Sequence, residues 1–163
     1  CMHTAVMTWR ELTIRILECE ESKEQIATEI LSALPAWFGI PESTAKYIRE
    51  SKHMPFFVAY SDRVPIGFLA IKRNTHYAAE VYVMGVLPEH HRCGAGRALL
   101  SRCHAWCKAQ GCEFLQVKTL DASFPDEGYE KTRRFYEAMG FRPLECLPLW
   151  GESCPCLMMV LAL

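Results

Sequence analysis

The 163-residue sequence has no long hydrophobic run and no excess of charge of either sign. Its longest apolar stretch, Cys156 to Leu163, is far too short to cross a bilayer. Lys and Arg number 18 and Asp and Glu number 19, which gives a net charge of -1. Because this balance argues against general binding of polyanions or membrane surfaces, we expect neither a nucleic acid nor a membrane as a partner.

Cysteine is abundant, yet the paired spacing of a structural zinc site is missing. Nine cysteines are an odd number, which favours reduced thiols over a complete set of disulfides. The closest pairs are Cys103 with Cys107 and Cys154 with Cys156, and neither pair has a second half at zinc-ligand spacing. We therefore expect no metal.

The beginning of the chain lacks the apolar segment of a signal peptide, so we expect a cytoplasmic protein. Cys1 precedes Met2, and residues 1–10 are expected to be a poorly ordered or tag-derived start. The length, with no internal repeat and no linker, favours a single domain over residues 1–163.

One stretch, from Glu80 to Gly111, organises the prediction. Residues 80–88 alternate and are rich in β-branched side chains, which predicts a strand that ends at a proline. Apolar residues then recur at helical spacing over 98–111. A basic turn with Gly94 and Gly96 lies between them. Because a helix start offers partial positive charge and unpaired N–H donors, we predict a phosphate-binding loop.

Two families of glycine-rich loops fit this turn poorly. A nucleoside-triphosphate loop needs Gly-Lys-Ser/Thr, whereas Gly96-Arg97-Ala98 offers no hydroxyl for magnesium. A dinucleotide loop needs a third glycine where Leu99 stands, although Asp121 imitates the acid that binds the ribose. Dinucleotide binding stays open as the weaker alternative.

The segment His91-Arg92-Cys93-Gly94-Ala95-Gly96 resembles the acyl-coenzyme A loop of the GNAT family of N-acetyltransferases, whose pattern is Gln/Arg-x-x-Gly-x-Gly/Ala. A second segment, Arg133 to Phe141, is similar to the family's helix that ends in Phe-Tyr-Glu-x-x-Gly-Phe. The resemblance implies an α/β fold of one domain, with a central mixed, mostly antiparallel sheet flanked by helices. It also implies acetyl-CoA as cosubstrate and no metal.

The expected cofactor contacts lie on the strand, the loop and a later helix. Gly85 predicts a bulge that splays the sheet and frees backbone amides for the pantetheine arm. His91 departs from the Gln or Arg of the family pattern, and Tyr129 stands where many members have asparagine. The residues expected to contact the cofactor are Met84, Gly85, Val86, His91, Arg92, Cys93, Gly94, Ala95, Gly96, Arg97, Tyr129 and Arg133.

Glu80 and Tyr136 are the catalytic candidates. Glu80 stands in the register where some family members carry a glutamate base, and strand alternation predicts one face for Glu80, Tyr82, Met84 and Val86. A solvated or salt-bridged strand residue is the alternative. Tyr136 matches the family's tyrosine that often protonates coenzyme A, although its place in an apolar helical stripe also fits a core residue.

The remaining pattern predicts the walls of the site and the other elements. Trp37 and Phe38 interrupt two helices and either cap the core or wall an acceptor pocket. The acidic loop from Asp121 to Gly128 is solvated with a capping role or holds a cationic amine. Strands are expected at 12–17, 56–60, 64–73, 114–120, 141–147 and 156–162, and further helices at 18–32, 41–51 and 129–139.

The resemblance predicts an N-acetyltransferase that moves an acetyl group from acetyl-CoA to a primary amine by direct attack in a ternary complex. A covalent route through an acetyl-cysteine ranks low because no cysteine stands beside an obvious histidine base. The acceptor is either a small-molecule amine or a protein amine, and a homodimer is compatible with the sequence. The alternative is a non-catalytic sensor that binds acyl-CoA.

Overall fold

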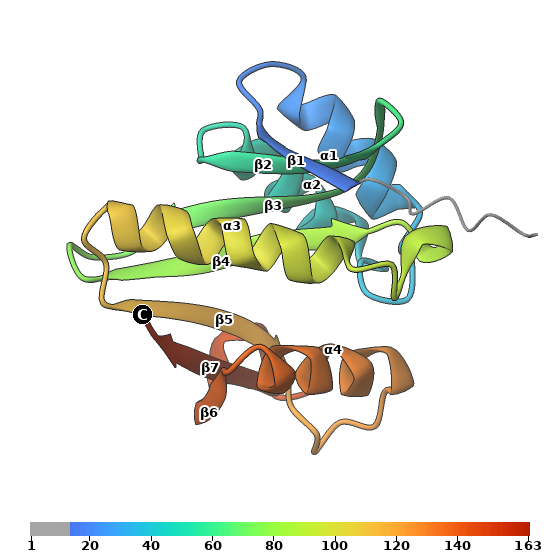
Figure 1. The fold of residues 1–163 in the computed structure, drawn as a ribbon. Coiled ribbons are helices and arrows are strands. Elements are labelled where there is room, and N and C mark those ends of the chain that lie inside the picture. The colour runs from blue at the N-terminus through green and yellow to red at the C-terminus, as the bar shows by residue number, and fades with distance from the viewer. Residues whose placement is uncertain (1–13) are drawn as a thin grey trace, which may run out of the picture.

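A seven-stranded sheet in the order β1-β2-β3-β4-β5-β7-β6 runs through the protein (Figure 1). The computed structural model describes residues 14–163, so the poorly ordered or tag-derived start expected at 1–10 and the first two residues of the strand expected at 12–17 lie outside the described residues. The elements are β1 (Ile14–Glu18), α1 (Lys23–Ser32), α2 (Pro41–Ser51), β2 (Phe56–Ser61), β3 (Val64–Arg73), β4 (Ala78–Val86), η1 (Pro88–His90), α3 (Ala95–Ala109), β5 (Phe114–Leu120), α4 (Glu127–Ala138), β6 (Arg142–Leu147), η2 (Pro148–Trp150) and β7 (Cys156–Ala162).

These elements confirm the predicted strands and helices, with boundary differences of a few residues. The hairpin between β2 and β3 turns through Asp62 and Arg63, which both have positive φ. Two such residues make the turn whose twist matches that of paired strands. Pro88 ends β4 as expected and begins the short helix η1.

The sheet is mixed and mostly antiparallel, as predicted. Only the neighbours β4 and β5 run parallel, because α3 carries the chain back across the sheet between them. Helices α1 and α2 pack on one face, and α3 and α4 pack on the other (Figure 1). Each face buries its own apolar cluster, one around Phe56 and Phe68 and the other around Leu99 and Leu115.

The parallel pair separates before its strands end. β4 and β5 are paired only where Ala78 to Val81 lie opposite Phe114 to Val117. Beyond that point β4 continues to Val86 and β5 to Leu120 without pairing to each other. The two strand ends therefore diverge in the middle of the sheet.

A bulge lies in β4, at a different residue from the one predicted. Ala70 lies opposite Val83 and Ile71 opposite Val81, so Tyr82 is the extra residue. Gly85 instead pairs regularly with Phe68, and the bulge predicted there is wrong.

Gly85 is a glycine for reasons of packing. A Cβ at this position would lie 2.9 Å from Cδ1 of Leu34 and 3.3 Å from Cγ2 of Ile30. A side chain here would force Leu34 and Ile30 to shift, so the glycine lets α1 and the residues that follow it pack closely on β4.

The bulge also changes which side chains of β4 share a face. Val81, Met84 and Val86 belong to the cluster under α3, whereas Tyr82 and Val83 belong to the cluster under α1 and α2. An extra residue inverts strand alternation, so the expected common face of Glu80, Tyr82, Met84 and Val86 is wrong.

Candidate functional site

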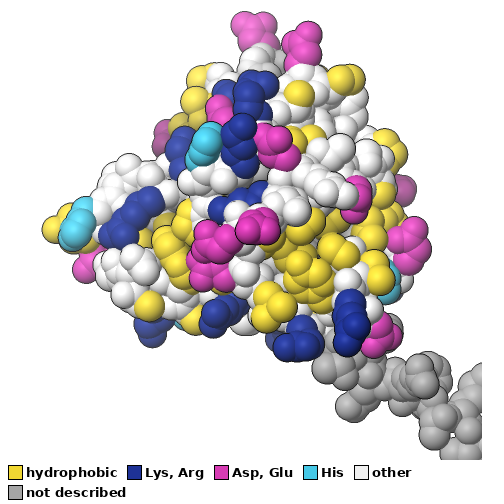
Figure 2. Space-filling view, turned by 90° about the horizontal axis from the view of Figure 1, so that it is seen from above, with side chains coloured by type: hydrophobic (Ala, Val, Ile, Leu, Met, Phe, Trp, Pro, Cys, Tyr) yellow, Lys and Arg dark blue, Asp and Glu magenta, His cyan; other side chains and the backbone are white. Residues whose placement is uncertain are grey.

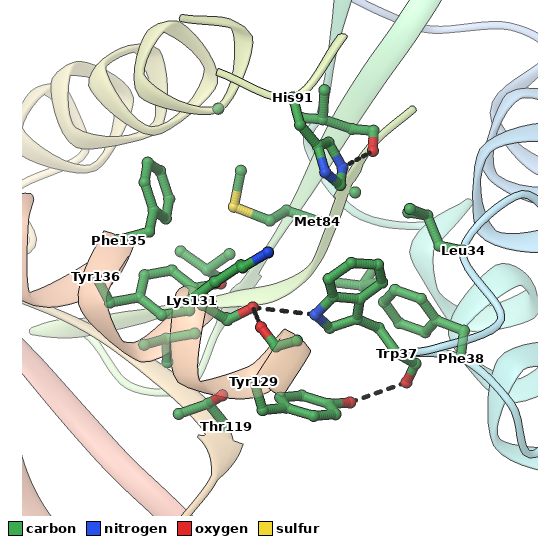
Figure 3. Close-up of a pocket in the computed structure, with 18 of the residues that line it drawn as sticks. Leu34, Trp37, Phe38, Met84, His91, Thr119, Tyr129, Lys131, Phe135 and Tyr136 are labelled. Atoms are coloured by element: carbon green, nitrogen blue, oxygen red, sulfur yellow. Dashed lines mark hydrogen bonds between the residues drawn. The ribbon is translucent and has the colours of Figure 1, made fainter. Parts of the chain in front are cut away.

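A cavity of about 910 Å³ opens where β4 and β5 diverge (Figure 3). Its lining comes from β4, β5, the start of α3, the first turns of α4 and the segment between α1 and α2. This volume lies within the range of small-molecule sites. The divergence of a parallel strand pair therefore leaves a pocket in the middle of the sheet.

The predicted phosphate loop borders this cavity. Gly94 stands immediately before α3 with φ 88, and no atom lies within 4 Å of the position of a Cβ. The positive φ favours glycine, and the open space leaves the main chain accessible. The first N–H groups of α3 have no acceptor within the helix. The loop thus combines open access with backbone donors, which suits an anion.

Basic side chains surround the same cavity. His90, Arg92 and Arg97 come from the loop, and Lys131 and Arg134 come from α4. Within residues 14–163 no Asp or Glu lines the cavity. The site is therefore cationic, although the whole chain is nearly neutral.

The structure brings together most of the predicted cofactor residues. Met84, Gly85, Val86, His91, Arg92, Gly94, Gly96, Arg97 and Tyr129 line the cavity. Cys93, Ala95 and Arg133 do not. The thiol of Cys93 donates to the carbonyl of His90, Ala95 is buried, and Arg133 donates to the carbonyl of Leu120 at 2.7 Å.

The imidazole of His91 is turned toward β4. Its Nε2 lies 2.7 Å from the carbonyl oxygen of Val86, and because a carbonyl only accepts, Nε2 must carry the proton. The ring also contacts the indole of Trp37 edge to face, with centroids 5.7 Å apart (Figure 3). His91 therefore joins the loop to the end of β4.

Tyr136 lies at the buried wall of the cavity on α4. It is 6% exposed, and its ring packs edge to face against Phe141, so it is also part of the core. Burial raises the pKa of Tyr136 well above the usual value for tyrosine. The hydroxyl therefore keeps its proton at neutral pH and is available as a donor.

Glu80 is buried beside the cavity and does not line it. Its Oε1 accepts from Asn74 Nδ2 at 3.0 Å, from Gln116 Nε2 at 3.0 Å and from Lys118 Nζ at 3.2 Å. Lys118 does line the cavity. This geometry matches the salt-bridged strand residue that the sequence left as the alternative.

Thr119 on β5 is a site residue that the sequence did not single out. It is 2% exposed and lines the cavity, and among the described side chains its Oγ1 is the buried polar atom without a hydrogen-bond partner. Leaving such a group unpaired costs about 1–3 kcal/mol. Two consecutive polar residues, at 118 and 119 near the end of the strand, were the available signal.

Trp37 joins the α1–α2 segment to α4 across the cavity. Its Nε1 donates to Thr132 Oγ1 at 3.1 Å, and its carbonyl accepts from the hydroxyl of Tyr129 at 2.8 Å (Figure 3). A Cβ on Gly128 would lie 3.1 Å from Cε2 of the indole, so glycine makes room for the ring. Burial raises the pKa of Tyr129 to about 12. Trp37 and Phe38 therefore line the cavity and also pack against the apolar cluster under α1 and α2, so neither predicted role excludes the other.

Residues 14–163 lack a metal-binding cluster and a membrane-spanning helix. No group of three or more His, Cys, Asp and Glu side chains is arranged to hold a metal ion. None of the helices in this part of the chain has the length and apolar content that a bilayer crossing requires.

A family model described as the acetyltransferase (GNAT) domain matches residues 52–143. No curated protein sequence is similar enough to count as a relative. A GNAT-family protein from Desulfovibrio desulfuricans has a similar structure, with a TM-score of 0.77 and 19% identity over 92% of this chain and 99% of its own.

Two further solved structures share the fold. The ribosomal-protein alanine N-acetyltransferase of Escherichia coli has a TM-score of 0.74 and 17% identity over 92% of this chain and 94% of its own. A GNAT acetyltransferase from Elizabethkingia anophelis with acetyl-CoA bound has a TM-score of 0.71 and 16% identity over 92% and 98%.

Proposed function

Because the chain belongs to the GNAT family of acetyltransferases, we propose that it transfers an acetyl group from acetyl-CoA to a primary amine by direct attack in a ternary complex. The observation that carries this proposal is a single cavity that borders both the cationic loop before α3 and the buried hydroxyl of Tyr136. In such a cavity the loop can bind the cofactor while Tyr136 takes part in the reaction.

The loop and the free edge of β4 are the proposed cofactor site. Arg92, Arg97 and the backbone around Gly94 and Gly96 would hold the phosphates of coenzyme A. The pantetheine arm would follow Met84 to Val86, where β5 no longer pairs with β4. Cys93, Ala95 and Arg133 do not line the cavity, and their proposed contribution is to support the residues that do.

The transfer forms a bond between the amine nitrogen and the acetyl carbon and breaks the bond from that carbon to sulfur. Tyr136 is proposed to give its proton to the departing thiolate, since it is protonated and lines the cavity. The amine must be neutral to attack, because an ammonium has no lone pair. Glu80 is the proposed acceptor of the amine proton. Because Glu80 lies behind Lys118, the proton would have to reach it through a relay.

The alternative is a protein that binds acyl-CoA without turnover. Two observations favour it: His91 is hydrogen-bonded to Val86, and Tyr129 is hydrogen-bonded to Trp37. Both residues depart from the family pattern, and both side chains are engaged within the protein.

Steady-state release of coenzyme A thiol from acetyl-CoA, measured over a panel of amines, separates the two functions. We expect amine-dependent thiol release and an acetylated product. Binding of coenzyme A without thiol release for any amine would establish the sensor, and tighter binding of NAD than of coenzyme A would favour the dinucleotide alternative. The cytoplasmic location and a homodimer stay predictions.

A further inference from the structure

The half of the cavity that faces α1 and α2 has aromatic walls. The ring of Phe38 lies edge to face with that of Tyr47 at 6.1 Å between centroids, and Tyr47 lies likewise with Tyr82 at 5.3 Å. Trp37 and Trp150 also line the cavity. The hydroxyl of Tyr82 donates to Glu50, and the indole N–H of Trp37 donates to Thr132. Because their polar groups are engaged, Tyr82 and Trp37 offer a ligand their ring surface.

Lys118 brings a positive charge to the β5 wall of the cavity. Its side chain is 26% exposed and lines the cavity, while its partner Glu80 is 5% exposed and lies behind it. On the face shown in Figure 2, Lys and Arg side chains are interspersed with Asp and Glu side chains. The lack of acids in the described lining is therefore specific to the cavity. Within residues 14–163 no carboxylate lines the cavity, and the acids Glu80 and Glu50 are hydrogen-bonded to the lining residues Lys118 and Tyr82.

We propose that the acceptor is a monoamine with an aromatic or large apolar body, and that Lys118 disfavours amines with a second positive charge. This inference rests on the proposed acetyl transfer and names its substrate class. Aromatic walls bury an apolar body and still tolerate one ammonium before it is deprotonated. A second ammonium, which stays charged throughout, finds no carboxylate in the described lining to pair with, because Glu80 already accepts from Lys118 and from two amides, and Lys118 repels it.

Two matched amine pairs test the charge rule. Hexylamine and hexamethylenediamine share an aliphatic body, and p-methylbenzylamine and p-xylylenediamine share an aromatic one. We expect kcat/KM to be higher for the monoamine of each pair by on the order of tenfold, as for unit charges several ångström apart in a partly solvated site. Equal or better use of the diamines would overturn the proposal.

Variants assign the selectivity to Lys118. Lys118→Gln keeps an amide donor for Glu80 and removes the charge, so the ratio of monoamine to diamine should fall severalfold. Lys108→Gln is the matched control, because Lys108 is an exposed lysine of α3 outside the cavity lining, and it should keep the wild-type ratio. An unchanged ratio in Lys118→Gln would remove Lys118 from the selectivity.

A second variant and a binding measurement test the inferred substrate class even if Lys118→Gln fails to fold or the protein does not turn over. Trp150→Ala removes a ring at the cavity edge that is already 36% exposed, and KM for p-methylbenzylamine should rise severalfold. Calorimetric titration of both amine pairs into the coenzyme A complex needs no chemistry. If the protein binds the monoamines selectively but acetylates none of the amines, the proposed acetyl transfer is wrong and the inferred preference for monoamines stands. If it acetylates diamines better than monoamines, acetyl transfer stands and the inferred preference is wrong.

Discussion

At the scale of single residues, the site depends on polar groups whose surroundings fix their protonation and pairing. Tyr136 holds its proton because burial disfavours the phenolate. Thr119 has a buried hydroxyl that nothing in the described protein pairs. Glu80 is the opposite case, because three donors already occupy its carboxylate. Substitution of each of these three residues should therefore have a different effect on activity, stability or pH dependence.

Tyr136→Phe should lower kcat by roughly tenfold to a thousandfold, as the loss of one general acid does, with little change in coenzyme A affinity. The ring stays in place against Phe141, so the melting temperature should hold. Steady-state kinetics and a coenzyme A titration measure the two effects. Wild-type kcat in this variant would limit Tyr136 to packing.

Thr119→Val should separate stability from activity. Removal of an unpaired buried hydroxyl at nearly constant shape should raise the free energy of unfolding by about 1 kcal/mol. If the hydroxyl pairs with the bound reactants, kcat/KM should fall by up to about tenfold, the value of one hydrogen bond. Urea unfolding and steady-state kinetics report these effects, and Thr119→Ser serves as the control that restores the donor. Full activity in Thr119→Val would show that the hydroxyl has no ligand.

Glu80→Gln tests whether Glu80 is the base. If Glu80 is the base, kcat/KM of the wild type should rise with pH through an ionisation that the variant lacks, while coenzyme A affinity stays unchanged. If Glu80 only holds Lys118 and the strand, the variant should lose about 1–3 kcal/mol of stability and keep the shape of its pH profile. Glu50→Gln, which alters a carboxylate bonded to Tyr82, is the matched control.

At the scale of elements, α3 offers an internal comparison between its two ends. Gly94 precedes the helix with φ 88, and Gly111 follows it with φ 82, and neither has an atom within 4 Å of a Cβ position. The two glycines thus face the same backbone requirement. Only Gly94 borders the cavity.

Gly94→Ala and Gly111→Ala should each cost about 1–2 kcal/mol, because alanine is strained at positive φ. Only Gly94→Ala should also weaken coenzyme A binding, since its methyl group occupies the approach to the backbone donors. Chemical denaturation and calorimetry measure the pair. Equal coenzyme A affinity in the two variants would reject the loop as the phosphate site.

At the scale of the whole molecule, buried tyrosines couple the site to stability at alkaline pH. Burial raises the pKa values of Tyr47, Tyr82, Tyr129 and Tyr136, and that of Tyr129 to about 12. These residues lie on α2, β4 and α4 around one cavity. Ionisation of any of them places a charge between packed elements.

The free energy of unfolding should therefore fall as pH rises above about 10, the pKa of a tyrosine in the unfolded chain. A raised folded pKa gives stability that is complete below the unfolded pKa and is lost as pH rises through the folded pKa. Tyr129 alone should contribute about 1 kcal/mol to this loss by pH about 11, which lies midway between its unfolded and folded pKa values. Urea titrations from neutral pH to pH about 11 measure it, and Tyr129→Phe should show a smaller decline. An identical decline in that variant would contradict the assignment.

The sequence by itself determined the elements, the mixed sheet and the glycine loop before α3, because these follow from local patterns. Alternation and helical spacing located the strands and helices, and two glycines at a helix start located a loop that lines the cavity. The pair Phe135 and Tyr136 likewise indicated the α4 wall of the cavity.

Tertiary structure alone decided how side chains are distributed around that site. One extra residue at Tyr82 inverts the alternation of β4, which no spacing in the sequence reveals, and so separates Glu80 from Met84. The close approach of Leu34 explains Gly85, and the separation of β4 from β5 exposes Thr119 and Lys118 to one cavity. These features depend on contacts between segments far apart in the chain, which local propensity does not encode.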